Sequence, residues 1–488
     1  KKRERRYNRK FNNSKIKKMA LQLQQKPLYN TVAAEQDIIF VIKEDTTIVA
    51  NESKVKYVAY VNVYSDSAAP VQIGVFKTTP NAAEVGIFDF STILKNYVTP
   101  DFTGTDAGGV ISTFKGAAYS NTNYHSLHTV DKSALGVNSV KWFQIDFKIE
   151  YEGAEPAFPN FVAEDPSMST STENHILYNG VVDETDVLQT FGSNFGYNLE
   201  VAGFATYGTT VTGGALSDAP LTQYARITDY GTLPFFSNCI PPDEGFHSPT
   251  INNAEVEMFN SSGASLGTFD VAVTSSATTT LAMNKIVFIG CFPANFTGAG
   301  YAAWNTNKAN VSYYTVKTEN ASIGVIGQTY RFDIICESGR GYEGIRLTWL
   351  NKHGTWDYYT FNKKSVRSLS TNRKTYTQLS GTWNEATYKL HGSSGGRKNY
   401  KVDTKEKIKM NTDYISQDES VWLEQLINSP EVYILNGYQS DVGGTLRRYV
   451  QPVTLTTSSH TRKTIANDKL IQYTFEVERT KNQRTQSV

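Results

Sequence analysis

The sequence has few of the residues and motifs that define disulfide-rich, membrane-spanning or metal-dependent proteins. Its 488 residues include three cysteines, Cys239, Cys291 and Cys336, with no C-x-x-C pair. An odd, widely spaced set argues against a disulfide framework and indicates buried thiols made in a reducing compartment. No apolar run approaches the roughly 18 residues that a bilayer-spanning helix needs. No apolar segment follows the basic start, as it would in a signal peptide. We therefore expect no membrane partner.

The chain also has no excess of one charge, and its composition does not favour helices. The chain carries 48 Lys and Arg against 47 Asp and Glu, so no field of the whole molecule points to nucleic acid. Long Ala/Leu/Glu runs are absent, whereas Thr, Ser, Asn, Gly, Tyr and Phe are abundant. This composition favours strands and turns over helices. The length exceeds that of one ordinary hydrophobic core, so we expect several domains.

The basic residues gather at the N-terminus. The first eighteen residues, KKRERRYNRKFNNSKIKK, contain ten basic residues and the single acid Glu4. Such a segment has almost nothing apolar to bury, so it is expected to be disordered unless a partner holds it. Two interpretations stay open. The arm is either a solvated tail or a contact that neutralises phosphates or meets an acidic neighbouring surface.

The most strongly patterned stretch is Tyr342–Ser365, YEGIRLTWLNKHGTWDYYTFNKKS. Apolar residues alternate with polar ones on both sides of a break that contains Gly354, which predicts a β-hairpin. Its Trp and Tyr side chains are expected to pack against cross-strand neighbours in a β-rich core. It contains only one His and one Asp, so we interpret it as an architectural element.

Two short helices are predicted. Ser416 and Glu419 form an S-x-x-E capping box before the helix near residues 417–428, and Ser429-Pro430 ends it. The segment Asp89–Tyr97 is the other candidate, with Ser91 as its N-cap.

These signals predict a mainly β fold made of antiparallel β-sandwiches with long loops, followed by a C-terminal β-rich domain with one or two short helices. The predicted strands are Ile38–Lys43, Val55–Tyr64, Val71–Lys77, Trp142–Tyr151, Ala254–Asn260, Gly267–Thr274, Lys285–Cys291, Val311–Thr315, Gln328–Cys336, Glu431–Leu435, Val450–Thr457 and one at 471–477. The predicted units are a basic arm at 1–30, a β-sandwich at 31–152, a loop-rich insertion with a few strands at 153–245, a second sandwich at 246–337 and the C-terminal domain at 338–488.

None of the candidate chemical motifs has the context that its chemistry needs. Gly263-Ala264-Ser265-Leu266-Gly267 matches the G-x-S-x-G nucleophile elbow, but strand-like segments flank it on both sides, so it is interpreted as a hairpin turn. His125 and His128 are three apart in a polar loop without further metal ligands nearby. The Gly-rich segment 391–398 lacks the order of a phosphate-binding loop. We therefore expect no catalytic residues, no metal site, no cofactor and no enzyme.

Several packing segments resemble the C-terminal part of virion structural proteins of tailed bacteriophages, particularly phages of marine and Bacteroidota hosts. The segments are IRLTWLNKHGTWDYYTFNKKS, DESVWLEQLINSPEVYI, QPVTLTTSS and NDKLIQYTFEVERTKNQR, and VGIFDFSTILKNYV resembles a recurring N-terminal segment of the same family. The resemblance implies a non-enzymatic protein of the tail, baseplate or neck. It also implies assembly in the host cytoplasm into the virion, as a homo-oligomer that contacts other virion proteins. It carries no catalytic site.

Two other classes of function stay open. One is a receptor- or glycan-binding phage appendage, a tail fibre or spike component, that uses exposed aromatic residues such as Trp304, Tyr313 and Tyr314, unless these residues belong to a core. The other is a hydrolase built on Ser265 or on unpaired carboxylates. The sizes of the purified species, glycan binding by a Trp304→Ala variant and hydrolysis by a Ser265→Ala variant distinguish the three classes.

Overall fold

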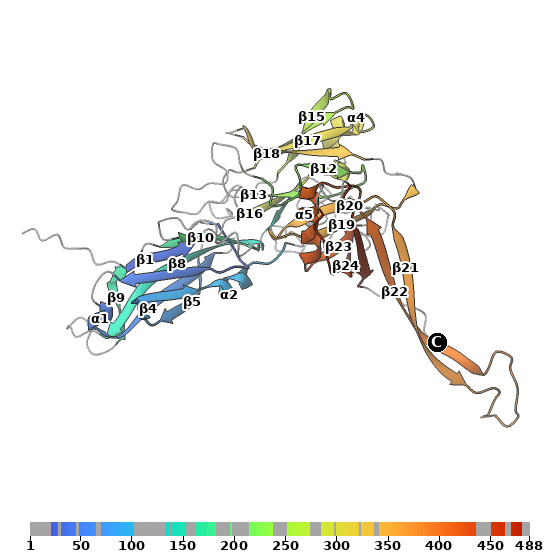
Figure 1. The fold of residues 1–488 in the computed structure, drawn as a ribbon, viewed down its shortest axis with the longest axis horizontal. Helices are drawn as coiled ribbons and strands as arrows, with labels where there is room; N and C mark the ends of the chain where they lie inside the picture. Colours follow the sequence, from blue (N-terminus) through green and yellow to red (C-terminus); the bar gives the residue numbers. More distant parts are fainter. Residues whose placement is uncertain are drawn as a thin grey trace, which may run out of the picture.

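The protein is mainly β, with several antiparallel and mixed sheets and a few short helices (Figure 1). The structure is a computed structural model that describes residues 21–27, 31–44, 48–64, 70–101, 133–136, 138–152, 162–170, 172–181, 196–197, 214–237, 251–273, 285–296, 299–321, 324–335, 341–383, 385–435, 450–463 and 470–480. None of the helices in these ranges is both long enough and apolar enough to cross a bilayer.

The N-terminal part is a sandwich of two sheets. One sheet has the order β11-β1-β3-β6, with β1 at Leu21–Pro27, β3 at Ile39–Glu44, β6 at Val85–Asp89 and β11 at Gly196–Tyr197. The other has the order β2-β10-β8-β4-β5, with β2 at Thr31–Ala33, β4 at Ser53–Tyr64, β5 at Val71–Thr78, β8 at Val140–Glu152 and β10 at Glu173–Tyr178; β9, Val162–Ser169, also pairs with β8. Alternating apolar residues of both sheets, among them Phe40, Phe88, Phe143 and Phe147, form one buried cluster.

Two predictions for this region need correction. The predicted arm extends to residue 30, but Leu21–Pro27 is a strand that pairs antiparallel with β3. Its Gln-rich sequence offered little hydrophobic pattern, whereas β3 provides backbone hydrogen-bond partners. The predicted helix at 89–97 is a single turn of α-helix, α2 at Ser91–Leu94, followed by a 3₁₀ turn at Lys95–Tyr97. Phe90, not Ser91, is the N-cap, because Asp89 already accepts the hydrogen bonds of the Ser91 backbone and hydroxyl.

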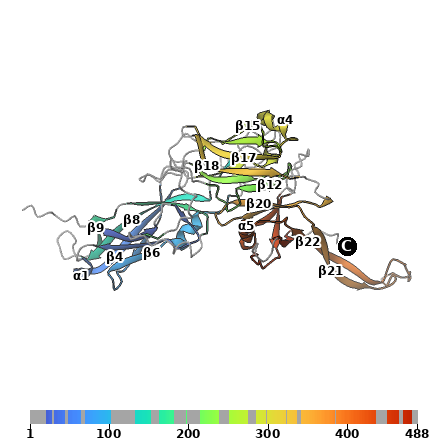
Figure 2. The ribbon, with the colours of Figure 1, turned by 45° about the horizontal axis from the view of Figure 1, so that its top comes forward.

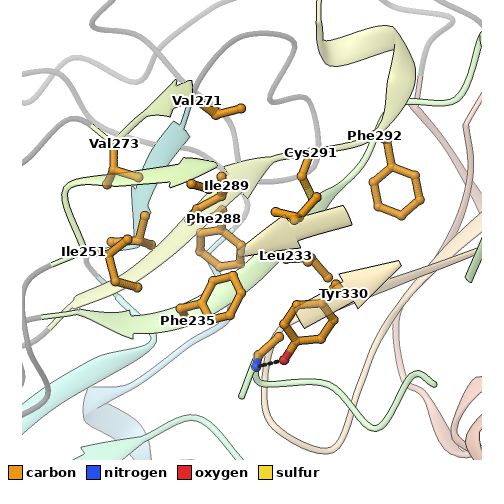
Figure 3. Packing of buried hydrophobic residues seen from close by; sticks show 14 of the residues in the cluster. Leu233, Phe235, Ile251, Val271, Val273, Phe288, Ile289, Cys291, Phe292 and Tyr330 are labelled. Carbon is orange, nitrogen blue, oxygen red and sulfur yellow. Dashed lines mark hydrogen bonds between the residues drawn. The ribbon is translucent and has the colours of Figure 1, made fainter. Parts of the chain in front are cut away.

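The middle of the chain forms a second sandwich. Its five-stranded sheet has the order β12-β18-β17-β14-β15, with β12 at Thr222–Ala225, β14 at Asn253–Phe259, β15 at Ser265–Ala272, β17 at Tyr313–Asn320 and β18 at Gly324–Ile334. The facing sheet is β13-β16-β7, with β7 at Ser133–Gly136, β13 at Thr232–Ser237 and β16 at Lys285–Gly290. Figure 3 shows the core between them, in which Phe235, Phe288 and Tyr330 face one another. Short helical segments lie beside this sandwich: Pro293–Asn295, Ala299–Tyr301 and α4 at Ala302–Asn307.

Sheet pairing crosses the predicted unit boundaries. The three strands of the β13-β16-β7 sheet come from the ranges predicted as the first sandwich, the insertion and the second sandwich. In addition, β12 of the predicted insertion pairs parallel to β18, so the second sandwich is mixed and not purely antiparallel. Pairing between strands so far apart in the chain leaves no mark in the local alternation of residues, from which the boundaries were inferred.

The C-terminal part is one seven-stranded sheet with a helix packed on it. The order is β20-β19-β23-β24-β25-β22-β21, with β19 at Ile345–Leu350, β20 at Trp356–Phe361, β21 at Val366–Gln378, β22 at Gly396–Asn411, β23 at Val432–Leu435, β24 at Val450–Leu455 and β25 at Thr474–Arg479. The helix α5 spans Gln417–Asn428, and its capping box is formed by Ser416 and Glu419. The hairpin β19–β20 and the helix confirm their predictions. Another short helix, α1, spans Ile48–Asn51.

Candidate interaction surface

A long hairpin extends away from the body of the protein. Strands β21 and β22 are paired from Val366↔Lys409 at the base to Gln378↔Gly396 near the tip. The next strand of the sheet, β25, pairs only with residues 407–411 of β22, so the rest of the hairpin is a ribbon of two strands. Both ribbon views show it projecting from the sheet (Figures 1 and 2). We call residues 366–411 the projecting hairpin.

The base of the projecting hairpin is firmly held. Ile408 and Met410 are fully buried in the core of the C-terminal sheet. The Arg367 guanidinium lies 2.9 Å from a Glu406 carboxylate oxygen and also binds Glu343, and this pairing raises the pKa of Arg367. The hairpin is therefore a rigid extension of the sheet at its base and is not a loose loop.

One face of the projecting hairpin is rich in lysine. Because side chains alternate along a strand, Lys401, Lys405, Lys407 and Lys409 of β22 share one face. Near the base, Lys405 and Lys407 lie 2.8 and 3.2 Å from carboxylate oxygens of Glu478 and Glu476 on β25. Beyond the end of β25, Asp403 of the hairpin itself lies 3.2 Å from Lys401, and Glu385 lies 3.8 Å from Lys389.

The distal cations have few anionic partners. Lys374 on β21 lies directly opposite Lys401 on β22, although like charges in that position destabilise a ribbon. No carboxylate among the described residues pairs with Arg373, Lys374, Arg397 or Lys398. The whole projecting hairpin contains ten basic and three acidic residues, a net charge of +7 in a chain of net charge +1.

The tip carries exposed apolar side chains. Leu379, Trp383 and Leu390 are 71, 69 and 68% exposed, and Tyr388 is 52% exposed. The Trp383 and Tyr388 rings pack against each other with centroids 5.2 Å apart, and the Trp383 indole N–H donates to the carbonyl of Ser380 at 2.7 Å. Exposed apolar groups of this size at the end of a charged ribbon are typical of a contact surface. A two-stranded ribbon is also marginally stable alone.

A buried polar junction connects the β19–β20 hairpin, helix α5 and the segment 214–220. The Asp357 carboxylate accepts hydrogen bonds from the Ser217 hydroxyl at 2.6 Å, the Trp422 indole at 2.6 Å and the Asn351 amide at 3.0 Å. Burial raises the pKa of Asp357 to about 6, although these three donors act against the rise. Each donor comes from a different segment, so Asp357 ties the three together.

A second carboxylate lies beside this junction. Asp218 accepts from His353 Nε2 at 2.9 Å and from the Lys352 ammonium at 2.6 Å. Burial opposes ionisation of Asp218, but the His353 hydrogen bond and the Lys352 charge together hold its pKa well below the usual range. Burial also lowers the pKa of His353, so a neutral ring donates its Nε2–H to the carboxylate. Gln425 of α5 donates to the same carboxylate at 2.7 Å, which makes the group a structural clamp.

Two of the three aromatic residues proposed for glycan binding are in the core. Trp304 is 2% exposed and Tyr314 is fully buried, with their ring centroids 5.7 Å apart. Tyr313 is half-buried between Phe259 and the Arg331 guanidinium. Of the two alternatives left open by the sequence, core and exposed, Trp304 and Tyr314 are core residues, because both pack in the second sandwich. The exposed aromatic pair, Trp383 and Tyr388, was missed.

The other sequence candidates do not form a site in the described residues. Ser265 is exposed. It is the first residue of β15 and follows the turn of the β14–β15 hairpin, as the strand-like segments on both sides predicted. Within the described ranges no three His, Cys, Asp or Glu side chains are grouped so as to bind a metal. Cys291 is buried, and burial raises the pKa of its thiol. His125, His128, Cys239, Cys336 and the arm segment 1–18 lie outside the described residues.

Comparisons with known proteins identify no family for this chain. No protein-family model matches it, and no curated protein matches it. Solved structures with a detectable similarity include the native conformation of E. coli alpha-2-macroglobulin, at 8% identity and a TM-score of 0.19 over 80% of this chain and 22% of that one. Another is the Dpr2 Ig1-Ig2 complex with DIP-Theta Ig1-Ig3, at 9% identity and a TM-score of 0.15 over 80% and 94%. TM-scores this low carry no argument about fold family or function.

Proposed function

We propose that this chain is a non-enzymatic virion structural protein of a tailed phage that assembles in the tail, baseplate or neck through contacts with other copies and other virion proteins. The observation that carries the proposal is the projecting hairpin. Its apolar tip and its distal cations are exposed on a ribbon whose base is held in the C-terminal sheet, as in a surface that is completed by a neighbouring molecule.

Other features support the same function. Described residues of the C-terminal segments whose sequence resembles phage virion proteins contribute to the core of the C-terminal sheet and helix α5, which hold the base of the projecting hairpin. The buried clusters around Asp357 and Asp218 connect these elements with neutral donors and an ion pair. Such a scaffold presents a ribbon at a defined angle, which suits repeated contacts in a symmetric particle.

The test removes the ribbon without disturbing its base. Thr371 and Thr404 are directly paired, so a two-residue Asn-Gly turn between them shortens the hairpin and keeps Glu406 with its Arg367 partner and the β22–β25 pairing. We expect the purified full chain to form oligomers in analytical ultracentrifugation and the shortened variant to sediment as a smaller species with the same thermal stability. Ser265→Ala is the control and should change neither. A chain that stays monomeric at high concentration and turns over a substrate would refute the proposal.

A second candidate function is a receptor- or glycan-binding appendage of a phage. The observation that favours it is the exposed Trp383–Tyr388 pair, since aromatic faces are suited to stacking on sugar rings. Binding on a glycan array that is lost in Trp383→Ala and kept in Leu390→Ala would support this function. Loss of assembly without any glycan signal would favour the structural role.

A further inference from the structure

We propose that the projecting hairpin of one copy docks on residues 31–181 of a second copy, with its apolar tip against the edge formed by strands β5 and β6. This inference rests on the proposed function, because it names the partner of the same surface. The contact is heterologous, so each copy offers its hairpin to one neighbour and its N-terminal sandwich to another.

Charge complementarity is the first argument. Residues 31–181 contain eighteen acidic and nine basic residues, a net charge of −9, and the projecting hairpin has a net charge of +7. The two blocks carry opposite net charges of similar size. Complementary fields of this kind guide two surfaces together and exclude like-charged partners.

The second argument is the repulsion between like charges in a hairpin that has no partner. Lys374 and Lys401 oppose each other across the ribbon; Lys401 also lies 3.2 Å from the Asp403 carboxylate, whereas no carboxylate among the described residues pairs with Lys374 or the adjacent Arg373. This arrangement is unfavourable in an isolated ribbon, but carboxylates of a partner would neutralise it.

The proposed acceptor is an exposed sheet edge. Strand β5 is the last strand of its sheet and β6 is the last strand of the other sheet. Val71 and Val75 of β5 are 59 and 41% exposed, Ile87 of β6 is 53% exposed, and the Glu84 side chain in the connecting turn is 54% exposed. Unpaired edges with exposed apolar residues invite contact with another chain. The exposed apolar side chains of this edge match the apolar tip of the hairpin, and the exposed Glu84 carboxylate, 3.6 Å from Lys43 in its own copy, offers an anionic partner to the basic shaft.

The shape of the molecule makes the contact intermolecular. The N-terminal sandwich and the projecting hairpin lie at opposite ends of the molecule in both ribbon views (Figures 1 and 2). A hairpin therefore reaches the β5–β6 edge of a neighbour and not that of its own copy. Repetition of this contact builds a ring or a linear array.

The experiment uses the full chain and a zero-length carbodiimide cross-linker, which joins lysines to carboxylates. Copies labelled with nitrogen-15 are mixed with unlabelled copies, and mixed-isotope peptides identify links between two molecules. We expect mixed-isotope links from Lys374 or Lys401 to carboxylates of residues 31–181, and their loss at high salt because screening shortens the range of exposed charges.

Charge reversal provides the matched variants. Lys374→Glu with Lys401→Glu should raise the dissociation constant of the oligomer at least about tenfold, since two exposed attractions become repulsions. The control, Lys308→Glu with Lys364→Glu, makes the same change in net charge at exposed lysines outside the hairpin and should leave it unchanged. Adding Glu84→Lys to the hairpin variant should restore part of the affinity.

The outcomes separate this inference from the proposed function. Two outcomes would overturn the docking site and leave the structural role intact. In one, the mixed-isotope links join the hairpins of two copies. In the other, the oligomer still needs the hairpin but shows no mixed-isotope links. Residues 1–30 have a net charge of +10. If their lysines are linked to residues 31–181 only within single molecules, the arm occupies the acceptor, and the proposed docking is also overturned. Binding of the hairpin to DNA or anionic vesicles with no cross-linked dimer would do the same.

Discussion

The buried carboxylate of Asp357 leads to a prediction about stability and pH. Its three hydrogen bonds come from Ser217, Trp422 and Asn351, and burial raises its pKa from 3.8 to about 6. Between these two pH values the folded protein binds more protons at this group than the unfolded chain does. The stability that this group contributes is therefore fully present below pH 3.8 and is lost as the pH rises through about 6.

The size of the effect follows from the pKa. A rise of about two pH units corresponds to roughly 3 kcal/mol of differential stability between the neutral and charged forms. In Asp357→Asn the charge is absent at every pH, but the amide offers one acceptor oxygen and leaves the Trp422 or Ser217 donor unpaired. An unpaired buried donor costs about 1–3 kcal/mol. At pH 7 the two effects nearly cancel, whereas at pH 4.5 only the unpaired donor remains.

The assay is urea denaturation followed by tryptophan fluorescence at pH 4.5, 5.5, 6.5 and 7.5. The difference in free energy of unfolding between wild type and Asp357→Asn should shrink by roughly 2 kcal/mol between pH 4.5 and 7.5, since part of the full effect is already lost at pH 4.5. Groups such as His353 and Asp218 titrate in both proteins, so their contributions largely drop out of the difference. Asp270→Asn, at an exposed position on β15, is the control and should show no trend. A difference that is constant with pH, or that grows as the pH rises, would refute the argument.

Two further predictions concern packing. Trp304→Ala should lower the free energy of unfolding by about 3–5 kcal/mol, because it leaves a cavity beside Tyr314. The same variant should leave any glycan binding unchanged. Lost binding with unchanged stability would contradict the place of Trp304 in the core. Gly354→Ala should destabilise the protein by more than about 1 kcal/mol, because residue 354 has φ +72° and an added Cβ would overlap the Asn179 carbonyl. Thermal denaturation measures this effect, and an unchanged melting temperature would show that Asn179 does not lie against the turn.

Sequence reasoning was most successful where local pattern and local chemistry agree. The hairpin β19–β20 was predicted from alternating apolar residues around a glycine, and helix α5 from its capping box. Most of the other predicted strands were located within a few residues, because apolar and polar residues alternate along a half-buried strand. The turn at Ser265 was distinguished from a nucleophile elbow by its flanking strands.

The projecting hairpin was missed because its strands lack this alternation of apolar and polar residues. Nearly every residue of β21 is exposed, so neither of its faces is apolar and no hydrophobic alternation marks it. The signal that was present is polar: lysines recur at 401, 405, 407 and 409, and threonine and serine are frequent in 368–377. Such a pattern also describes many loops, so it predicts a strand only after pairing is known.

By itself, then, the sequence determined the strand-rich character of the chain, the caps and turns, the separate blocks of charge and the absence of a recognisable catalytic motif, since each of these depends on residue types and their spacing. Only the tertiary structure decided which distant strands pair, as in the β13-β16-β7 sheet, and which aromatic residues are buried. Trp304 and Trp383 belong to the same residue type, yet one lies in a core and the other at an exposed tip. The physical reason is that burial and strand pairing depend on contacts between segments far apart in the chain, and local sequence does not encode those contacts.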